Sequence, residues 1–336
     1  MKLRTKRTSF LVVIFGTLSL LIALAPSVAL AGGGGGGVSV DTVALYQSDE
    51  STLISPGGSM DPQVEYAVKV TVTNDGMGNL SDVDYVKVTI FYDSSGTDPT
   101  APGTSNTQTC AILTCDVGTP PSWSIDPSTS TTWVLVTANC VQPSLSGYTG
   151  SWWFHFKPGK VATESGAADD WDIYGWATTG MSTDYLYTRD YEMNWYGEVV
   201  GNTANINWGS VNPDSDFGES TKQTGISVTY IANGAYDEQV AASGPWSGNP
   251  SGTAVLDASG TPLGNEFSLK ADDTATLANA VLLAVSPTYV TIDDTGVQTS
   301  ESGDTVTTNT VWLKLGTPFT IATFSGSVYY KIADGS

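Results

Sequence analysis

The sequence predicts an all-β protein with two antiparallel β-sandwich domains in tandem, and three observations support this prediction. Apolar and polar residues alternate in most apolar segments, which is the pattern of half-buried strands. Clusters of Gly, Pro, Asp and Ser separate these segments and offer turn chemistry. Helical spacing of apolar residues is almost absent beyond the first 31 residues. Short strands recurring between turn clusters are typical of β-sandwiches.

The first 31 residues predict a signal peptide. Basic residues within positions 2–7 precede an apolar run over 10–25, and Ala29-Leu30-Ala31 follows. This order is the one that signal peptidase recognises. The apolar run is shorter than the ~20 residues of a membrane span. We therefore expect cleavage after Ala31, a secreted or cell-surface location, and no membrane span in the mature chain; retention of the leader as an N-terminal anchor is the alternative.

Residues 32–37 are glycines and predict a flexible leader between the signal peptide and the folded body. We expect the first sandwich domain over 38–200 and the second over 201–336, each long enough for its own core. The segment 94–132 begins without periodicity, so it predicts a long loop insertion in the first domain.

The predicted strands follow one another along both halves. In 65–76, Tyr66, Val68, Val70 and Val72 fall on one face, and the turn residues Asn74-Asp75-Gly76 follow. The other segments with strand character in the first half are 84–93, 133–140, 151–157, 170–179 and 191–200. Those in the second half are 204–211, 225–232, 237–243, 265–271, 288–294, 309–316 and 325–333.

The charge balance disfavours two classes of partner. Without the four basic residues of the leader, 9 of the 13 Lys and Arg remain against 34 Asp and Glu, so the mature chain carries about −25. Such a chain repels nucleic acid and anionic membranes. We interpret the charge as a solvated surface suited to salty or calcium-containing surroundings.

Two segments carry a resemblance to a known family. Residues 70–92, VTVTNDGMGNLSDVDYVKVTIFY, and the pair INWGSVNPDSD and ISVTYIANG of 206–234 resemble immunoglobulin-like domains of bacterial and archaeal surface proteins. The likeness covers parts of both halves. The resemblance implies an immunoglobulin-like sandwich and a cell-surface location, and it assigns no catalytic residue to this chain.

The three cysteines predict one disulfide in an exported protein. Alternation suggests that Cys140 points inward with Val134 and Val136, and that Cys110 shares a face with Ile112. We therefore expect a Cys110–Cys140 disulfide, although the spacing alone leaves the pairing open.

The stretch GSWWFHFKPGK, residues 150–160, contains the strongest candidates for ligand binding. Alternation places Trp152, Phe154 and Phe156 on a face that must be core, because exposing three large rings is costly. Trp153 and His155 lie on the opposite face, where a ring could stack on a sugar or cover an edge beneath a loop. A further candidate of this kind is Trp176.

The sequence offers one weak metal site and no recognisable catalytic motif. Asn212, Asp214 and Asp216 alternate, with Glu219 nearby, and calcium prefers such oxygen ligands. However, Phe217 stands where an EF-type loop needs glycine. No catalytic elbow, zinc helix or nucleotide-binding glycine loop occurs. We expect no enzyme and no cofactor, apart from calcium as an option.

We therefore predict a structural or adhesive protein, such as a surface-layer, matrix or filament component. Its expected partners are other surface proteins or further copies of itself, with specificity residing in loops. The alternative is an extracellular carbohydrate-binding module with exposed tryptophans, for which carbohydrate would be the partner.

Overall fold

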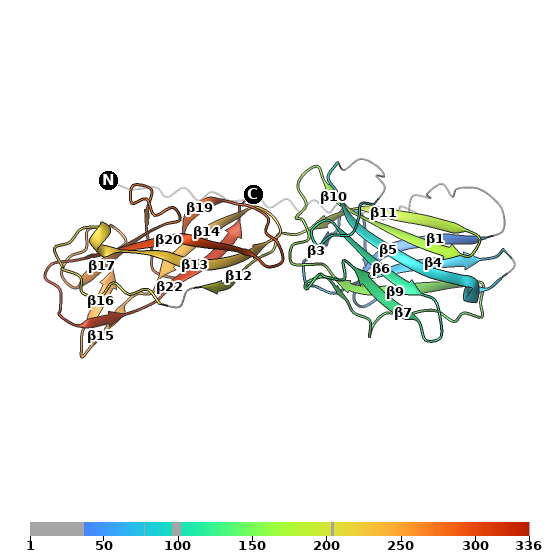
Figure 1. The fold of residues 1–336 in the computed structure, drawn as a ribbon, viewed down its shortest axis with the longest axis horizontal. Helices are drawn as coiled ribbons and strands as arrows, with labels where there is room; N and C mark the ends of the chain where they lie inside the picture. Colours follow the sequence, from blue (N-terminus) through green and yellow to red (C-terminus); the bar gives the residue numbers. More distant parts are fainter. Residues whose placement is uncertain (1–36, 77, 96–101, 203–204, 336) are drawn as a thin grey trace, which may run out of the picture. The chain divides into compact units, whose positions relative to one another are not determined.

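The computed structural model describes residues 37–76, 78–95, 102–202 and 205–335. The predicted signal peptide and all of the glycine leader except Gly37 lie outside these residues. The described residues belong to one compact unit. Their regular structure consists of β-strands and two short 3₁₀ helices, Leu80–Asp82 and Glu219–Thr221 (Figure 1). The all-β prediction is therefore confirmed for the described part of the chain.

Strands within 38–193 form two sheets. The first has the strand order β2 (Leu53–Ile54), β1 (Val38–Gln47), β4 (Tyr66–Asn74), β9 (Thr149–Lys157), β8 (Val134–Leu135). The second has the order β3 (Ser59–Met60), β11 (Thr183–Met193), β10 (Asp170–Thr179), β5 (Val83–Asp93), β6 (Cys110–Asp116), β7 (Ser122–Asp126). All pairs are antiparallel except β3 with β11.

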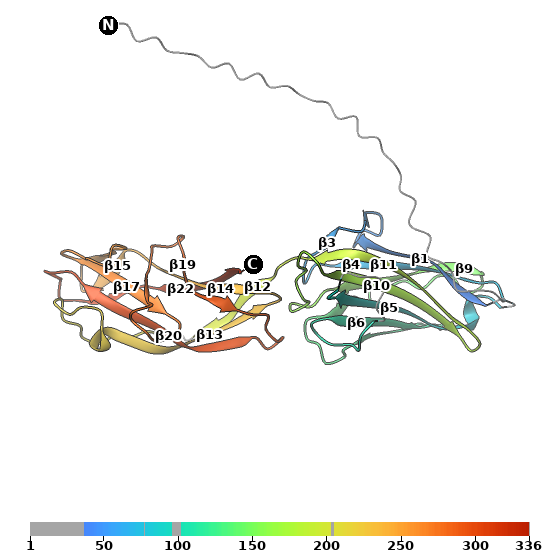
Figure 2. The same ribbon diagram turned by 90° about the horizontal axis from the view of Figure 1, so that it is seen from above.

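Strands within 197–334 form two further sheets. The larger has the order β12 (Gly197–Asn202), β13 (Lys222–Ala232), β20 (Asp304–Leu315), β17 (Glu266–Asp272), β16 (Thr253–Leu256), β15 (Trp246–Asn249), β21 (Thr323–Ser325), with β18 (Val281–Leu282) paired to β17. The smaller has the order β19 (Val290–Gly296), β14 (Tyr236–Ala242), β22 (Val328–Asp334). Figure 2 shows β13, β17 and β20 alongside one another, as their pairing requires.

Each half has its own hydrophobic core between its sheets. In the first half, Val70 and Phe154 of one sheet pack in the same cluster as Ile90, Leu113 and Ile173 of the other. In the second half, Val228, Leu269 and Val311 of the large sheet share a cluster with Val240 and Ile332 of the small one. Sheets that bury a common apolar layer are consistent with β-sandwich packing.

Most predicted strands are present, but four segments differ from expectation. The segment 191–200 is divided between β11 and β12, and β12 pairs with β13 of the second half. The segment 94–132, expected as a loop insertion, contributes β6 and β7 to the second sheet. In 133–140 only Val134–Leu135 forms a strand. The described part of 204–211 contains no strand; there Ile206, Trp208 and Val211 pack on the second core without a sheet partner.

The described residues contain no helix with the length and apolar character needed to cross a membrane.

Candidate functional site

Strand β9 places its aromatic residues as alternation predicts. Trp152, Phe154 and Phe156 are fully buried in the first core. Trp153 lies on the outer face, where it is half-buried. Its backbone exchanges hydrogen bonds of 2.9 and 3.0 Å with Val141, so the segment after β8 runs along this strand. The ring of Tyr46 meets Trp153 edge-on at 5.2 Å, and Lys69 Nζ lies 5.4 Å from the Trp153 ring centre.

His155 is buried on this outer face. Its Nδ1 lies 2.9 Å from Glu65 Oε1, and its Nε2 lies 3.0 Å from Glu50 Oε1. Asn139 Nδ2 also donates to Glu65 Oε1, at 2.7 Å. Burial raises the pKa of Glu65, but the hydrogen bonds from Asn139 and His155 outweigh burial and leave that pKa below its ordinary value. Both ring nitrogens therefore have partners within the protein.

Trp176 lies on the outer face of the other sheet of the first half. There it packs with aromatic residues of β10 and β11 in an outer aromatic cluster, defined as Tyr174, Trp176, Tyr185 and Tyr187. The rings of Tyr174 and Tyr187 have centroids 5.2 Å apart and planes inclined by 21°. This separation and inclination are those of an offset stack, in which one ring lies partly over the face of the other. Such rings cover each other's faces instead of forming one flat platform.

The structure does not bring the three predicted ligand residues together. Trp153 and His155 lie on one outer face of the first sandwich, and Trp176 lies on the opposite outer face. All ten tryptophans fall within the described residues, and none of them is exposed. A sugar platform built from exposed tryptophans therefore gains no support from the fold.

The predicted Cys110–Cys140 disulfide is wrong, because all three cysteines are free. The core face of β6 carries Ala111, Leu113 and Cys115, so Cys110 lies on the outer face beside Phe91 and Tyr174. Cys140 lies along the edge of β9 in the other sheet, where its sulfur accepts the backbone N–H of His155 at 3.3 Å. A disulfide between packed sheets needs both cysteine side chains to point into the core, and Cys110 points away from it. The sandwich therefore separates the predicted pair.

The same burial makes the three thiols poor nucleophiles. Burial raises the pKa of Cys110 and of Cys140 to about 11, and that of Cys115 to about 12. Since the thiolate is the reactive form, we expect slow reaction at neutral pH.

The four predicted calcium ligands lie in an exposed segment. Asp216 Oδ1 is 3.1 Å from Lys314 Nζ, and Glu219 Oε2 is 2.7 Å from Lys222 Nζ. Asn212 and Asp214 are exposed. Hydrogen bonding to Lys314 lowers the pKa of Asp216. A calcium ion would have to displace both lysines, and calcium binding here stays a prediction.

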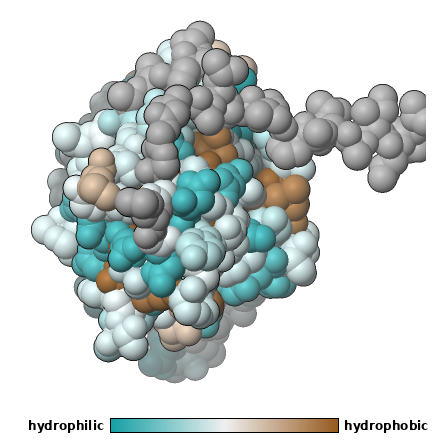
Figure 3. Space-filling model, turned by 90° about the vertical axis from the view of Figure 1, so that its right-hand side faces the viewer, coloured by the Kyte–Doolittle hydropathy of each residue, from teal (hydrophilic) through white to brown (hydrophobic). Residues whose placement is uncertain are grey.

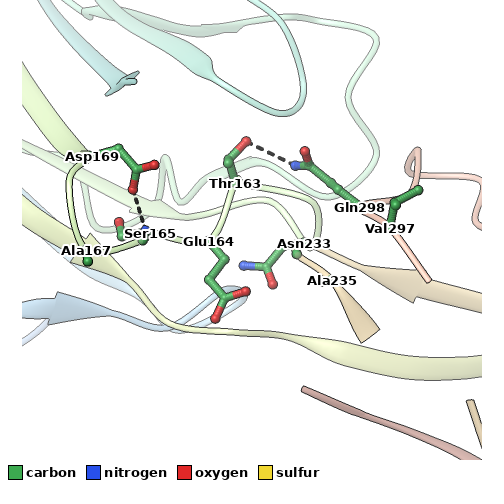
Figure 4. A pocket seen from close by; sticks show the side chains of 11 residues that line it. Thr163, Glu164, Ser165, Ala167, Asp169, Asn233, Ala235, Val297 and Gln298 are labelled. Carbon is green, nitrogen blue, oxygen red and sulfur yellow. Dashed lines mark hydrogen bonds between the residues drawn. The ribbon is translucent and has the colours of Figure 1, made fainter. Parts of the chain in front are cut away.

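A hollow of about 520 Å³ lies where loops of the two halves meet (Figure 4). Its acidic side chains are Glu164 and Asp169, and Asn233, Val297 and Gln298 line it from the second half. Burial and the nearby Asp334 raise the pKa of Glu164 to about 7. Asp169 Oδ2 accepts the hydroxyl of Tyr92 at 2.5 Å.

Asn233 connects the segments around this hollow. It is fully buried, and its Nδ2 donates to the carbonyls of Ala162 and Asn194 at 2.8 and 2.9 Å. Its Oδ1 accepts the backbone N–H of Tyr196 at 2.6 Å. Every polar atom of this side chain is hydrogen-bonded, so burying it costs little free energy. The three hydrogen bonds hold three chain segments together.

Glu301 forms a second connection between the halves. Its carboxylate accepts hydrogen bonds from Ser130 Oγ, Thr131 N, Thr131 Oγ1 and Thr132 Oγ1 at 2.5 to 3.2 Å. Burial raises the pKa of Glu301, but these hydrogen bonds outweigh burial and hold the pKa below its ordinary value. The neighbouring Gln298 donates to the carbonyl of Val161 at 2.9 Å.

The groups that line the hollow are not arranged as a nucleophile with its base. Ser165 Oγ accepts the backbone N–H of Met193 at 2.9 Å, and the lining contains no histidine or cysteine. A carboxyl such as Glu164 can bind a cation or exchange a proton, but acyl transfer also needs an activated nucleophile. The arrangement is suited to holding loops together.

Sequence reasoning missed Asn233, Glu301, Asp172 and Glu238. Asn233 precedes Gly234 and looks like an ordinary turn residue, and Glu301 lies in a polar stretch, so no pattern marks either one. Glu238 did carry a signal, because alternation in 236–242 places it on the apolar face with Tyr236 and Val240. A carboxyl on the apolar face of a strand indicates a buried acid.

Comparison with known protein families finds no matching family model, and comparison with curated proteins finds no relative of significant sequence similarity.

Proposed function

We propose that the chain is a secreted, non-catalytic structural or adhesive component of a cell surface, built from two immunoglobulin-like sandwiches behind a signal peptide. The observation that carries this proposal is the hydrogen-bonded connection of the halves through Asn233 and Glu301. Two sandwiches tied in this way suit a component that keeps its geometry under load.

The contacts of the candidate binding residues support the same function. Trp153 and His155 have structural partners on one sheet, and Trp176 packs into the outer aromatic cluster on the other. In Figure 3, hydrophilic residues are interspersed with a few hydrophobic ones on the face that is shown. An acidic, mostly hydrophilic surface favours contact through loops and edges.

Self-association would use the sheet edges. Among the described strands, the small sheet of the second half ends in β19 and β22, which are seven residues each. An edge strand presents unpaired backbone groups to which another strand can add. Tyr329 on β22 is 40% exposed and lies on such an edge.

The test is electron microscopy of the purified protein without residues 1–31, with and without millimolar calcium. We expect filaments or sheets, and we expect Tyr329→Lys to reduce them by placing a charge on the β22 edge. Tyr148→Lys, at a 64% exposed position away from that edge, is the matched control. Uniform monomers under all conditions, together with retention on insoluble polysaccharide, would favour the carbohydrate-binding alternative.

A further inference from the structure

Four acidic side chains are buried among the described residues: Asp93, Asp172, Glu238 and Asp272. Asp93 accepts hydrogen bonds from the backbone and hydroxyl of Ser95, and Asp272 accepts them from Thr274 and Thr276. Such donors stabilise a charged carboxylate. Asp172 and Glu238 have poorer surroundings.

Glu238 lies inside the second half and is 1% exposed. The hydroxyl of Tyr230 and the amide of Asn309 both donate to the same oxygen, Oε1, the latter at 2.6 Å. Close by, Asn309 Oδ1 and the hydroxyl of Tyr330 are buried without a hydrogen-bond partner. Asn309 Oδ1 can only accept a hydrogen bond, and a proton on the Glu238 carboxyl would supply the donor that it lacks.

The charged groups with the largest effect on Glu238 are acidic, namely Asp293 and Asp273, and Lys331 of β22 is the register partner of the neighbouring residue Gln239. The titratable groups facing Glu238 are Tyr230 of β13, Tyr236 of its own strand, Asp293 of β19, Asp273 after β17 and Tyr330 of β22. Burial, with the charges of Asp293 and Asp273, raises the pKa of Glu238 to about 7 against the hydrogen bonds from Tyr230 and Asn309.

Asp172 repeats this situation in the first half. Asp172 is 2% exposed, and its Oδ1 has no hydrogen-bond partner. The backbone N–H of Asp190 lies near the carboxyl group and acts to lower its pKa. Asp170 precedes Asp172 on β10, and Asp93 is the register partner of Asp170 on β5. Burial and these carboxyls raise the pKa of Asp172 to about 7 and that of Asp170 to about 6. Tyr174 and Tyr191 also lie near Asp172. The basic group nearby is Arg189, whose Nε lies 3.9 Å from Asp190 Oδ2.

A cluster of acids can be neutralised by a metal ion or by protons. Within the described ranges, no three His, Cys, Asp or Glu side chains are placed so that they could hold a metal ion. Protons need no such arrangement. We propose that Asp172 and Glu238 carry protons in the folded protein, so that this fold is most stable in mildly acidic surroundings and loses stability as the pH rises.

The direction follows from proton linkage. Each group binds its proton more tightly in the folded than in the unfolded chain, so its contribution is complete below the unfolded pKa and is lost as the pH rises through the folded pKa of about 7. Groups such as Glu65 and Glu301, whose pKa is lowered, act oppositely, and their stabilisation is lost only in more acidic solution. Each raised group changes the unfolding equilibrium on the order of 100-fold between pH 4 and pH 8.

The test compares melting temperatures at pH 5 and pH 8 for the wild type, Glu238→Gln and Asp172→Asn. We expect the wild-type Tm to fall by about 10 °C, and each variant to lose a large part of this fall because an amide cannot ionise. The exposed Asp294→Asn and Asp84→Asn are matched controls and should keep the full pH dependence.

An equal pH dependence in the wild type, Glu238→Gln and Asp172→Asn would overturn the proposal. A second measurement does not depend on variants that fold. Infrared spectra of the wild type at pH 6, where exposed carboxyls are ionised, should contain a carboxylic-acid carbonyl band that disappears at pH 8.5. Absence of this band at pH 6 would also overturn the proposal.

Discussion

Two groups of aromatic side chains in the first half have opposite surroundings. Trp152, Phe154 and Phe156 of β9 are fully buried between the sheets. The outer aromatic cluster lies on the outer face of β10 and β11, where Tyr185 is 52% exposed. The inner group gains from burial of its whole surface, whereas the outer group gains mainly from contact between its own rings. Aromatic richness therefore does not by itself indicate a binding platform.

The largest expected effect in this comparison is that of Phe154→Ala. Removing a fully buried ring leaves a cavity in the first core, and we expect the free energy of unfolding to fall by about 3–5 kcal/mol. Urea unfolding followed by tryptophan fluorescence measures this change. A loss below about 1 kcal/mol would mean that the inner face of β9 is not core.

Asn233→Ala should have the next largest effect. It tests a polar connection, whereas Phe154→Ala tests an apolar core. The substitution removes three hydrogen bonds and leaves two carbonyls and one N–H without their partner. We expect a loss of about 2–3 kcal/mol. The exposed Asn279→Ala is the control and should change stability little. Equal stability of the two variants would contradict the described connection of the halves.

Cys110→Ala should cost less than either. Cys110 is a buried free thiol beside Phe91 and Tyr174, so its loss should cost about 1 kcal/mol. Loss of a disulfide would cost about 2–5 kcal/mol. Thiol titration in denaturant without reductant should find all three cysteines reactive. A single reactive thiol would show that the other two form a disulfide.

Tyr185→Ala should have the smallest effect. Its ring stacks on Tyr174 and Trp176 but is half exposed to solvent, so we expect a loss of at most about 1 kcal/mol. A loss as large as that of Phe154→Ala would remove the distinction between the inner and outer groups.

Alternation predicted the inner group correctly because a strand with one apolar face has only one register that buries it. The period of two assigned Trp152, Phe154 and Phe156 to the core without any knowledge of the strand's neighbours. The same period misplaced Cys110, because β6 has apolar residues on both faces and Ala111 and Leu113 are the ones that point inward.

The residues of the candidate site were beyond such reasoning. Asn233 and Glu301 act through partners that are distant in the sequence, and only the folded loops bring these residues together. Glu238 interrupts an apolar face, whereas Asp172 shares its face with Asp170 and gives no such signal. The burial of both acids depends on strands whose order alternation does not determine.

The claim that the tryptophans build the fold and do not form a sugar platform is tested most directly by acrylamide quenching of tryptophan fluorescence. Acrylamide is neutral, so the negative charge of the protein does not repel it. With none of the ten tryptophans exposed, we expect quenching of the folded protein to be several-fold weaker than in urea and unchanged by soluble polysaccharides. Quenching close to that of the unfolded chain, or protection by a polysaccharide, would contradict the account.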